Sequence, residues 1–353
     1  MTHRPRTVVV VGASGTVGSG LLDALRERRE VTVRAVCRHP PEDARDGSRL
    51  TWHPLDLLAA DAADRLTEVL RGAQAVVHLA WAIQPVGDAS TPRSVDLDGT
   101  AAVLDATERA GVGHLVFLSS QAVYGPPPPG EPRRPVDEAW PVRAHPGSLY
   151  SRDKVAAEEM LDAFERAHPQ VAVTRVRAAL VVRAGSAGRM RRLFLGPAVP
   201  SVLLRALRAG RVPVLPLPSG LVLQLVHADD LGRAVAAALD RRLTGAVNVA
   251  ADALGPRELA AVAGARPLPV PRPVVRAVLG LLHRLHVLGA TTGWFDLAVD
   301  APVLDTGRAH RELGWSPAVD TARAARILLD ALAGPDPDDG PRPVSAPAAP
   351  GRG

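Results

Sequence analysis

Lysine is almost absent from this chain. The 42 basic residues include a single lysine, Lys154, and all the others are arginines. That lysine stands four residues after Tyr150, which is one of only two tyrosines. A lysine ammonium is a compact point charge and an arginine guanidinium is planar, so the two are not interchangeable at a functional site. The i, i+4 spacing puts the side chains of Tyr150 and Lys154 on one face of a helix. The sequence therefore predicts that Tyr150 and Lys154 act together.

A tyrosine beside a cation is suited to proton transfer. The ammonium favours the phenolate, so we expect the pKa of Tyr150 to fall from about 10 toward neutrality. A phenol with such a pKa can exchange a proton with a carbonyl or an alcohol. The alternative is a solvated helical Tyr and Lys, and the segments upstream of Tyr150 decide between the two.

Several other features are also missing. Cys37 is the only cysteine, which excludes an intrachain disulfide and a cysteine-based zinc cluster. No stretch reaches the ~18 uncharged apolar residues of a membrane span, and no cleavable apolar segment precedes the first predicted strand. The net charge is +5, but the arginines are interspersed with acidic residues through most of the chain and form no basic stripe with aromatic residues. We expect a cytoplasmic protein with no membrane span, no nucleic-acid partner, a small-molecule substrate and, as one option, a homodimer.

The N-terminal segment predicts a dinucleotide site. A β-branched run over residues 7–11 indicates a strand that is buried on both faces, and a glycine-rich loop and a helical pattern follow it. Glycines let the backbone approach a diphosphate, and the start of a helix supplies free N–H groups and a partial positive charge. The loop residues predicted to bind the cofactor are Gly12, Ser14, Gly15, Thr16, Val17 and Gly18.

The next two predicted strands suggest which cofactor binds. The strand over residues 31–37 ends at Cys37-Arg38, where an NAD-selective fold usually has an acidic residue for the ribose hydroxyls. An arginine at this place suits a 2′-phosphate, although it could also be a solvated strand end. Asp56, at the end of a third strand, and the adjacent Leu57 are expected to border the adenine. We therefore expect NADP(H), with NAD(H) as the alternative.

A pair of serines extends the predicted site. Ser119 and Ser120 follow a buried strand over residues 115–118, and in open parallel sheets ligands lie outside the carboxyl ends of the strands. Ser120 would then face the same cleft as Tyr150 and Lys154. By contrast, we interpret His78, within an apolar run, as a packed and hydrogen-bonded core histidine.

The alternation of predicted strands and helices indicates an α/β fold with a parallel sheet, and the length allows two lobes. We assign residues 1–182 and 222–250 to a dinucleotide-binding domain, and 183–221 and 251–333 to a substrate-binding lobe. Residues 171–182 are expected to form one buried strand, and residues 274–288 a helix. Residues 334–353 have nothing to bury, so a disordered tail is expected there.

With these pieces in place, the chain resembles the extended short-chain dehydrogenase/reductases, specifically the NAD-dependent epimerase/dehydratase family. The resemblance covers nearly all of residues 7–332 and includes the spacing G-x-x-G-x-x-G of the loop. The segments that carry it are residues 12–18, His78-Leu79-Ala80, Ser119-Ser120, Ala122-Val123-Tyr124-Gly125, residues 150–154, residues 226–230, residues 245–248 and Glu312-Leu313-Gly314-Trp315.

The resemblance implies a doubly wound parallel (Rossmann) sheet with a smaller C-terminal substrate-binding lobe. It also implies roles for individual residues. Tyr150 would be the proton donor or acceptor, and Lys154 would hold the nicotinamide ribose and lower the pKa of Tyr150. Ser120 would hydrogen-bond the reacting oxygen, while Leu79 and Ala80 would border the cofactor.

Three departures from the family pattern narrow the function. The family's sugar-nucleotide dehydratases carry an Asp-Glu pair directly after the catalytic hydroxyl, where this chain has Gln121-Ala122. The segment after Arg177 is apolar where a nucleotide-sugar enzyme has a polar residue, and Asp96 stands where the family has Asn.

We therefore predict an NAD(P)-dependent oxidoreductase that transfers a hydride at a carbonyl or secondary alcohol of a small, largely apolar substrate. One alternative is a nucleotide-sugar epimerase with tightly bound NAD. Another is a non-catalytic NADP-binding redox sensor.

Overall fold

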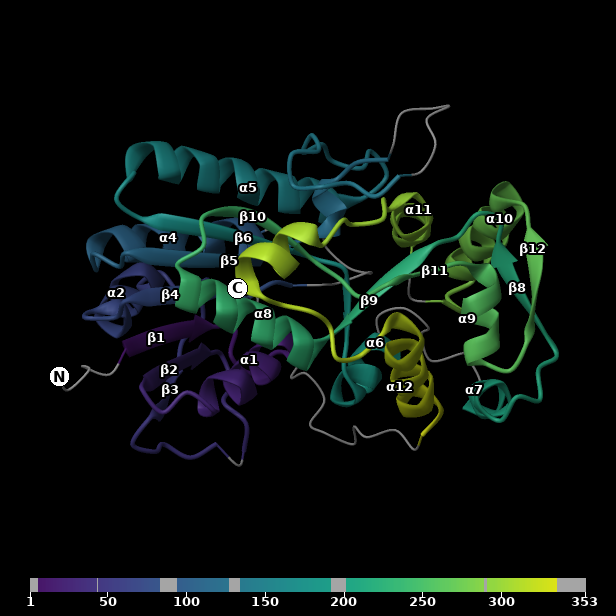
Figure 1. Ribbon diagram of the computed structural model, residues 1–353, viewed down its shortest axis with the longest axis horizontal. Coiled ribbons are helices and arrows are strands. Elements are labelled where there is room, and N and C mark those ends of the chain that lie inside the picture. Colours follow the sequence, from purple (N-terminus) through teal and green to yellow (C-terminus); the bar gives the residue numbers. More distant parts are fainter. Residues whose placement is uncertain are drawn as a thin grey trace, which may run out of the picture.

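The computed structural model of the protein describes residues 6–42, 44–82, 94–126, 134–191, 201–288 and 291–334, and every structural statement below concerns these residues. The larger of two lobes is built on a seven-stranded sheet, and a smaller lobe adjoins it (Figure 1). The predicted tail lies outside the described residues except for Gly334.

All seven strands of the central sheet are parallel, in the order β10-β6-β5-β4-β1-β2-β3. The strand order reverses between β1 and β4, which confirms the predicted doubly wound sheet. The strands are β1 Arg6–Val11, β2 Val31–Cys37, β3 Leu50–Pro54, β4 Ala75–His78, β5 His114–Ser120, β6 Ala172–Ala178 and β10 Gly245–Val249.

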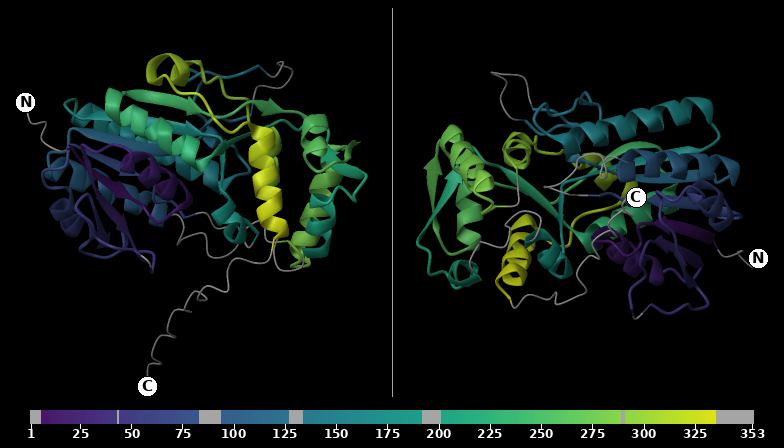
Figure 2. Two further views of the ribbon diagram at one scale, coloured as in Figure 1. Left: turned by 60° about the horizontal axis from the view of Figure 1, so that its bottom comes forward. Right: turned by 180° about the vertical axis from the view of Figure 1, so that it is seen from behind.

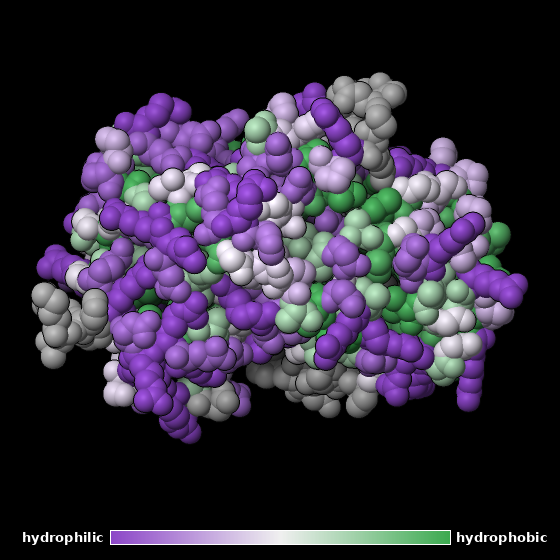
Figure 3. All heavy atoms as spheres, in the orientation of Figure 1, coloured by the Kyte–Doolittle hydropathy of each residue, from purple (hydrophilic) through white to green (hydrophobic). Residues whose placement is uncertain are grey.

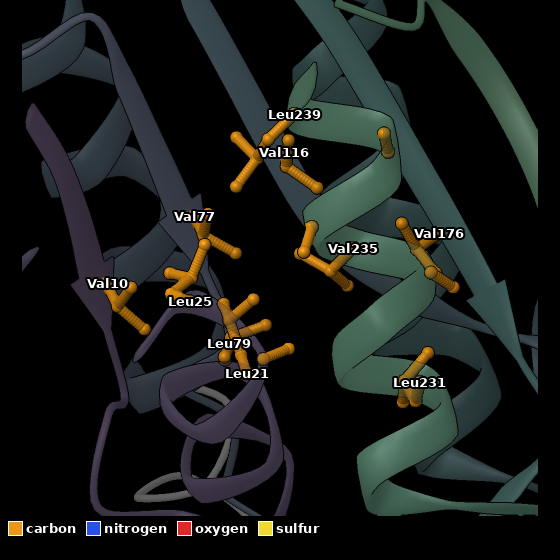
Figure 4. Close-up of a cluster of buried hydrophobic side chains, with 14 of the residues drawn as sticks. Val10, Leu21, Leu25, Val77, Leu79, Val116, Val176, Leu231, Val235 and Leu239 are labelled. Atoms are coloured by element: carbon orange, nitrogen blue, oxygen red, sulfur yellow. The ribbon is translucent and has the colours of Figure 1, made fainter. Parts of the chain in front are cut away.

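Helices cover both faces of this sheet, which explains the continuous β-branched run of β1. Val8 and Val10 face the layer of α1 and α8, whereas Val9 and Val11 face the layer of α2, α4 and α5. Figure 4 shows the first of these two cores, with Leu21 and Leu231 among its helical members. The helices are α1 Thr16–Arg26, α2 Ala62–Leu70, α4 Gly99–Arg109, α5 Leu149–Ala167 and α8 Ala228–Arg241.

The strand predicted over residues 171–182 is two strands, so that prediction was wrong. β6 ends at Ala178, and β7 Leu180–Val182 joins a second sheet with β9 Leu223–His227 and β11 Ala253–Leu254. The apolar run continues from β6 into β7, so the hydrophobic pattern contains no signal for the break between the two strands. β9 falls within residues 222–250 of the predicted dinucleotide-binding domain but pairs in this second sheet, whereas α8 and β10 return to the central one.

The smaller lobe is mostly helical, with one pair of parallel strands, β8 Val214–Pro218 and β12 Arg266–Val270. The helix predicted over 274–288 is α10, Arg272–Arg284; it begins two residues earlier, with a proline in its first turn. In both views of Figure 2 the yellow helix α12 Thr321–Ala333 stands between the larger lobe and this pair of strands. The remaining helices are α6 Ala187–Met190, α7 Ser201–Arg208, α9 Pro256–Val262 and α11 Thr292–Asp300.

Candidate active site

The glycine loop adopts a conformation that its own packing requires. Gly12 has φ +90°, and a Cβ at this residue would lie 2.6 Å from the backbone nitrogen of Ala80. A Cβ on Gly18 would lie 2.4 Å from the carbonyl oxygen of Ala13. A Cβ on Gly15, by contrast, would meet only the Gly12 carbonyl oxygen, at 3.2 Å. Gly12 and Gly18 are therefore fixed by the fold, whereas Gly15 has only this one close neighbour.

Helix α1 starts immediately after this loop, with Gly15 as its N-cap residue. Thr16, Val17 and Gly18 are its first three residues, whose N–H groups have no acceptor within the helix. No acidic side chain lies in the first turn and no side chain caps it. These donors fit the diphosphate of a dinucleotide.

The other residues predicted to contact the cofactor lie at the same edge of the sheet. Arg38 follows β2 and is exposed. Asp56 follows β3 and accepts a hydrogen bond from the Leu58 N–H at 3.1 Å, while Leu57 is buried. Leu79 and Ala80 follow β4 and pack against Gly12. The structure thus gathers the predicted residues around the carboxyl ends of β1, β2, β3 and β4.

Ser120 and Tyr150 meet at the end of β5. Ser120 is the last residue of that strand, and its Oγ accepts a hydrogen bond from the Ala122 N–H at 3.2 Å. Tyr150 lies in the first turn of α5, whose N-cap Ser148 accepts a hydrogen bond from the Ser151 N–H at 3.2 Å. The Ser120 hydroxyl lies close enough to the Tyr150 phenol to act on its pKa.

The pKa predicted for Tyr150 was wrong for this structure. Burial raises the pKa of Tyr150 to about 12; the nearby Ser120 hydroxyl opposes the rise, and the charge of Asp96 adds to it. Lys154 is not directed at the phenol, because its Nζ donates to the Leu118 carbonyl at 2.7 Å and lies 3.3 Å from the centroid of the Trp81 ring. Desolvation therefore outweighs the expected effect of the cation.

Asp96 and Lys154 are both buried, and the charge of each favours ionisation of the other. Burial raises the pKa of Asp96 to about 7, although its hydrogen bond with the Ala82 N–H and the charge of Lys154 oppose the rise. Burial lowers the pKa of Lys154 to about 7, against the charges of Asp96 and Glu158. The Ala82 N–H donates to the Asp96 carboxylate at 2.6 Å, so the carboxylate fixes the backbone next to Trp81.

Two tryptophans that the sequence did not single out line Tyr150. The Trp81 ring stands nearly perpendicular to the Tyr150 ring, with centroids 6.3 Å apart. The Trp294 ring, from α11 of the smaller lobe, is tilted by 38° at 5.1 Å. Trp81 directly follows the His78-Leu79-Ala80 segment, which was a usable signal. Trp294 is brought in from 144 residues away, and no local pattern could have indicated it.

A buried network of hydrogen bonds and one ion pair lies next to Ser120. Arg177 on β6 forms an ion pair with Glu158 at 2.6 Å and donates to the Tyr124 hydroxyl at 2.8 Å. The Tyr124 hydroxyl donates to Asn248 at 2.9 Å, and the Ser119 hydroxyl donates to Glu158 at 2.5 Å. Arg177 is thus fully engaged within the protein. The network joins β5, α5, β6 and β10 directly beside Ser120.

His78 has the structural role that its sequence context predicts. It is buried, its Nε2 is 3.1 Å from the Thr100 hydroxyl, and burial lowers its pKa to about 3. The imidazole is therefore uncharged at neutral pH, which fits a packed residue of the core.

Known proteins resemble this chain in sequence and in fold. A model of the NAD-dependent epimerase/dehydratase family matches residues 8–250. An uncharacterized protein of Mycobacterium tuberculosis is 28% identical over 317 residues, which are 88% of this chain but only 28% of that relative's length. A Yersinia pestis protein named UDP-glucose 4-epimerase is 32% identical over 181 residues, 48% of this chain and 52% of that protein. The solved structure of a Thermus thermophilus UDP-glucose 4-epimerase in complex with NAD shares the fold, with a TM-score of 0.63 and 23% identity over 93% of this chain and 99% of that one.

Proposed function

The chain belongs to the NAD-dependent epimerase/dehydratase family, and we propose that it is an NAD(P)-dependent oxidoreductase acting on a carbonyl or secondary alcohol. The observation that carries this proposal is the convergence of Ser120, Tyr150 and Lys154, from β5 and α5, at the same edge of the sheet as the glycine loop that follows β1. A dehydratase would need an acid and a base in addition, and Gln121 and Ala122 follow Ser120 instead.

Each residue of the trio has a distinct role in this proposal. Tyr150 exchanges the proton with the substrate oxygen, and Ser120 donates a hydrogen bond that stabilises negative charge developing there. Lys154 holds the nicotinamide ribose and supplies the positive charge near Tyr150. The nicotinamide, when bound, supplies or accepts the hydride.

The surroundings of Tyr150 favour an apolar substrate. Trp81 and Trp294 flank the phenol. Arg177 on β6 is occupied by Glu158 and Tyr124, and Ala178 and Ala179 after it are buried in the core. A diphosphate would require several convergent donors, and these segments supply none. We therefore favour a small, uncharged, largely apolar compound.

For the cofactor we favour NADP(H), because the exposed Arg38 follows β2 where an acidic residue would select NAD(H). If Arg38 contacts a 2′-phosphate, Arg38→Ala should cost about 1.5–3 kcal/mol in NADPH binding and leave NADH binding unchanged. Calorimetric titration of both cofactors measures this. Equal dissociation constants of the native protein for the two cofactors would remove Arg38 from cofactor selection.

A nucleotide-sugar epimerase is the second candidate, supported by the named Yersinia pestis relative, which matches about half of this chain. The two functions differ in cofactor exchange and in ligand class. Oxidation of NADPH by a panel of apolar aldehydes and ketones, without binding of UDP- or TDP-sugars, supports the reductase. Cofactor that copurifies stoichiometrically, together with micromolar UDP-sugar binding, would favour the epimerase instead.

A further inference from the structure

Exposed aliphatic side chains are concentrated at one end of the smaller lobe. Four elements at this end, α7, β8, β12 and α10, lie at the far side of the molecule from the N-terminus (Figure 1). Together with Leu285 at the C-cap of α10, they carry two thirds of the large hydrophobic residues that are exposed in the described part of the chain. We call these residues the lobe-tip surface: Val202, Leu203, Val214, Leu268, Val274, Val278, Leu281 and Leu285. Figure 3 shows the same asymmetry, since apolar residues gather over the smaller lobe while the rest of that face is mostly polar.

Helix α10 presents a continuous apolar stripe to solvent. Val274, Val278, Leu281 and Leu285 follow one another at spacings of four, three and four residues, and their exposed fractions are 51%, 51%, 56% and 62%. None of the helix residues is fully buried. An apolar stripe of this length on one side of a surface helix marks an interaction site.

The opposite side of α10 is attached to α11. Arg272 pairs with Asp300 at 3.0 Å, and Arg276 pairs with Asp296 at 2.9 Å. These pairs hold the helix in place, so the stripe faces outward.

Positive charge accompanies the exposed aliphatic residues. Residues 201–222 and 256–288 contain eight arginines and a single acidic residue, Glu258. On β12, Arg266 and Leu268 lie on one face of the strand, and Val214 of β8 is the register partner of Arg266. Seven of these arginines are exposed: Arg205, Arg208, Arg211, Arg257, Arg266, Arg276 and Arg284.

This combination matches the chemistry of an anionic membrane surface. Aliphatic side chains enter the boundary between headgroups and acyl chains, while guanidinium groups bind lipid phosphates. A second copy of the chain fits less well, because its own arginines would repel those of the first. No described helix has the length and apolar character needed to cross a bilayer.

We propose that the lobe-tip surface docks on anionic lipid bilayers, with α10 lying in the interfacial region. Only two helices separate the docked face from the site, since α10 packs on α11 through its other side, and α11 carries Trp294 beside Tyr150. A substrate that partitions into the bilayer would then reach Tyr150 along the smaller lobe. This last step rests on the proposed function, whereas the docking does not.

Vesicle co-sedimentation of the full chain tests the docking. We expect the protein to bind vesicles that contain phosphatidylglycerol at least tenfold more tightly than vesicles of phosphatidylcholine alone, and binding to weaken as salt is added. Replacing Val278, Leu281 and Leu285 together with Ser should reduce binding to phosphatidylglycerol vesicles at least tenfold. The matched control replaces three exposed aliphatic residues outside the lobe tip, Leu58, Val142 and Leu180, with Ser and should bind like the native protein.

Three outcomes would overturn the proposal. The native protein could stay in the supernatant with anionic vesicles at low salt, or the control triple could lose as much binding as the α10 triple. In the third, light scattering would find a dimer that the α10 triple variant dissociates, and the native protein would not bind vesicles, which would assign the surface to a second copy.

If the triple variant does not show the native unfolding transition, Leu285→Ser alone serves as the test variant, since this side chain is 62% exposed. Because vesicle binding needs no substrate or cofactor, its failure is separate from a failure of the proposed activity.

Discussion

The two tyrosines of this chain show how one side-chain type serves two purposes. Burial raises the pKa of both Tyr150 and Tyr124 to about 12. Tyr124 is held in the network by Arg177 and Asn248, so its hydroxyl has a fixed structural role. Tyr150 lies beside Ser120 and two tryptophan rings, at the end of β5. The surroundings, and not the pKa, therefore distinguish the two residues.

Replacing each tyrosine with Phe should separate these purposes. Tyr150→Phe removes the proton-exchanging oxygen, so we expect hydride transfer to fall by about 10² to 10⁴ while cofactor affinity stays near the native value. Tyr124→Phe leaves polar partners without their hydrogen bonds, so we expect a loss of about 1–3 kcal/mol in the free energy of unfolding and a smaller effect on turnover. Single-turnover kinetics and urea unfolding of both variants measure this. Comparable turnover in Tyr150→Phe and the native protein would remove Tyr150 from the mechanism.

Asp96 should control the protonation of Lys154. The negative charge of Asp96 favours the ammonium, and Asn in its place keeps an oxygen for the Ala82 N–H but lacks the charge. We therefore expect Asp96→Asn to lower the pKa of Lys154 further below about 7, so that a smaller fraction is charged at neutral pH.

The single lysine makes this measurable without substrate. Protein labelled with ¹³C at the lysine ε-carbon gives one side-chain resonance, whose shift is followed as pH is varied. Asp98→Asn, an exposed carboxylate in the same short π-helix Ser94–Asp98, is the control and should leave the titration unchanged. An unchanged or raised pKa in Asp96→Asn would show that the two charges are not coupled.

At the scale of elements, the crossing of α1 and α8 depends on two glycines. A Cβ on Gly20 would lie 2.4 Å from the carbonyl oxygen of Ala228, and a Cβ on Gly232 would lie 2.4 Å from the Gly20 backbone. The helices can approach this closely only because both positions lack a side chain. Since α1 starts at the glycine loop, this contact also fixes the direction of the helix that faces the predicted diphosphate.

Gly232→Ala should therefore destabilise the protein. Alanine in an open helical position stabilises by roughly 0.5–1 kcal/mol, but here the added methyl displaces backbone, which typically costs about 1–3 kcal/mol. Gly280→Ala in α10 is the matched control, because its Cβ would meet only the Thr292 methyl group at 3.5 Å and should stabilise slightly. Urea unfolding of both variants reports the signs. If Gly232→Ala were as stable as Gly280→Ala, the close crossing would not exist.

At the scale of the whole molecule, the polar network joins segments that are distant in sequence. Asn248, at the edge of the central sheet, donates to the Val136 and Asp305 carbonyls at 3.1 Å, and its own N–H donates to Glu138 at 2.8 Å. These bonds connect the sheet to the segment before α5 and to the chain that leaves the smaller lobe. The position of α11, and with it Trp294, depends on such contacts between lobes.

The sequence could predict the parts of this arrangement that have local signals. The strand, glycine loop and helix over residues 6–26, and the i, i+4 pair on α5, follow from residue type and spacing alone. The break at Ala179, the orientation of Lys154 toward Trp81 and the approach of Trp294 follow from tertiary packing, which a local pattern does not encode. The prediction of a lowered pKa for Tyr150 was wrong for the same reason, because the burial that raises this pKa depends on tertiary packing.

Because Lys154 is only 2% exposed, cleavage of the chain after this residue would report local unfolding of the protein. An endoproteinase that cuts only after lysine has one possible site, and it can bind there only when α5 unwinds. We expect such a protease to leave the folded protein intact and, as urea is added, to produce just two fragments, residues 1–154 and 155–353. Trypsin, which also accepts the exposed arginines, should cut without denaturant. A cofactor bound at Lys154 should slow the single cut in proportion to its occupancy, so cleavage kinetics could rank candidate ligands before any activity is known.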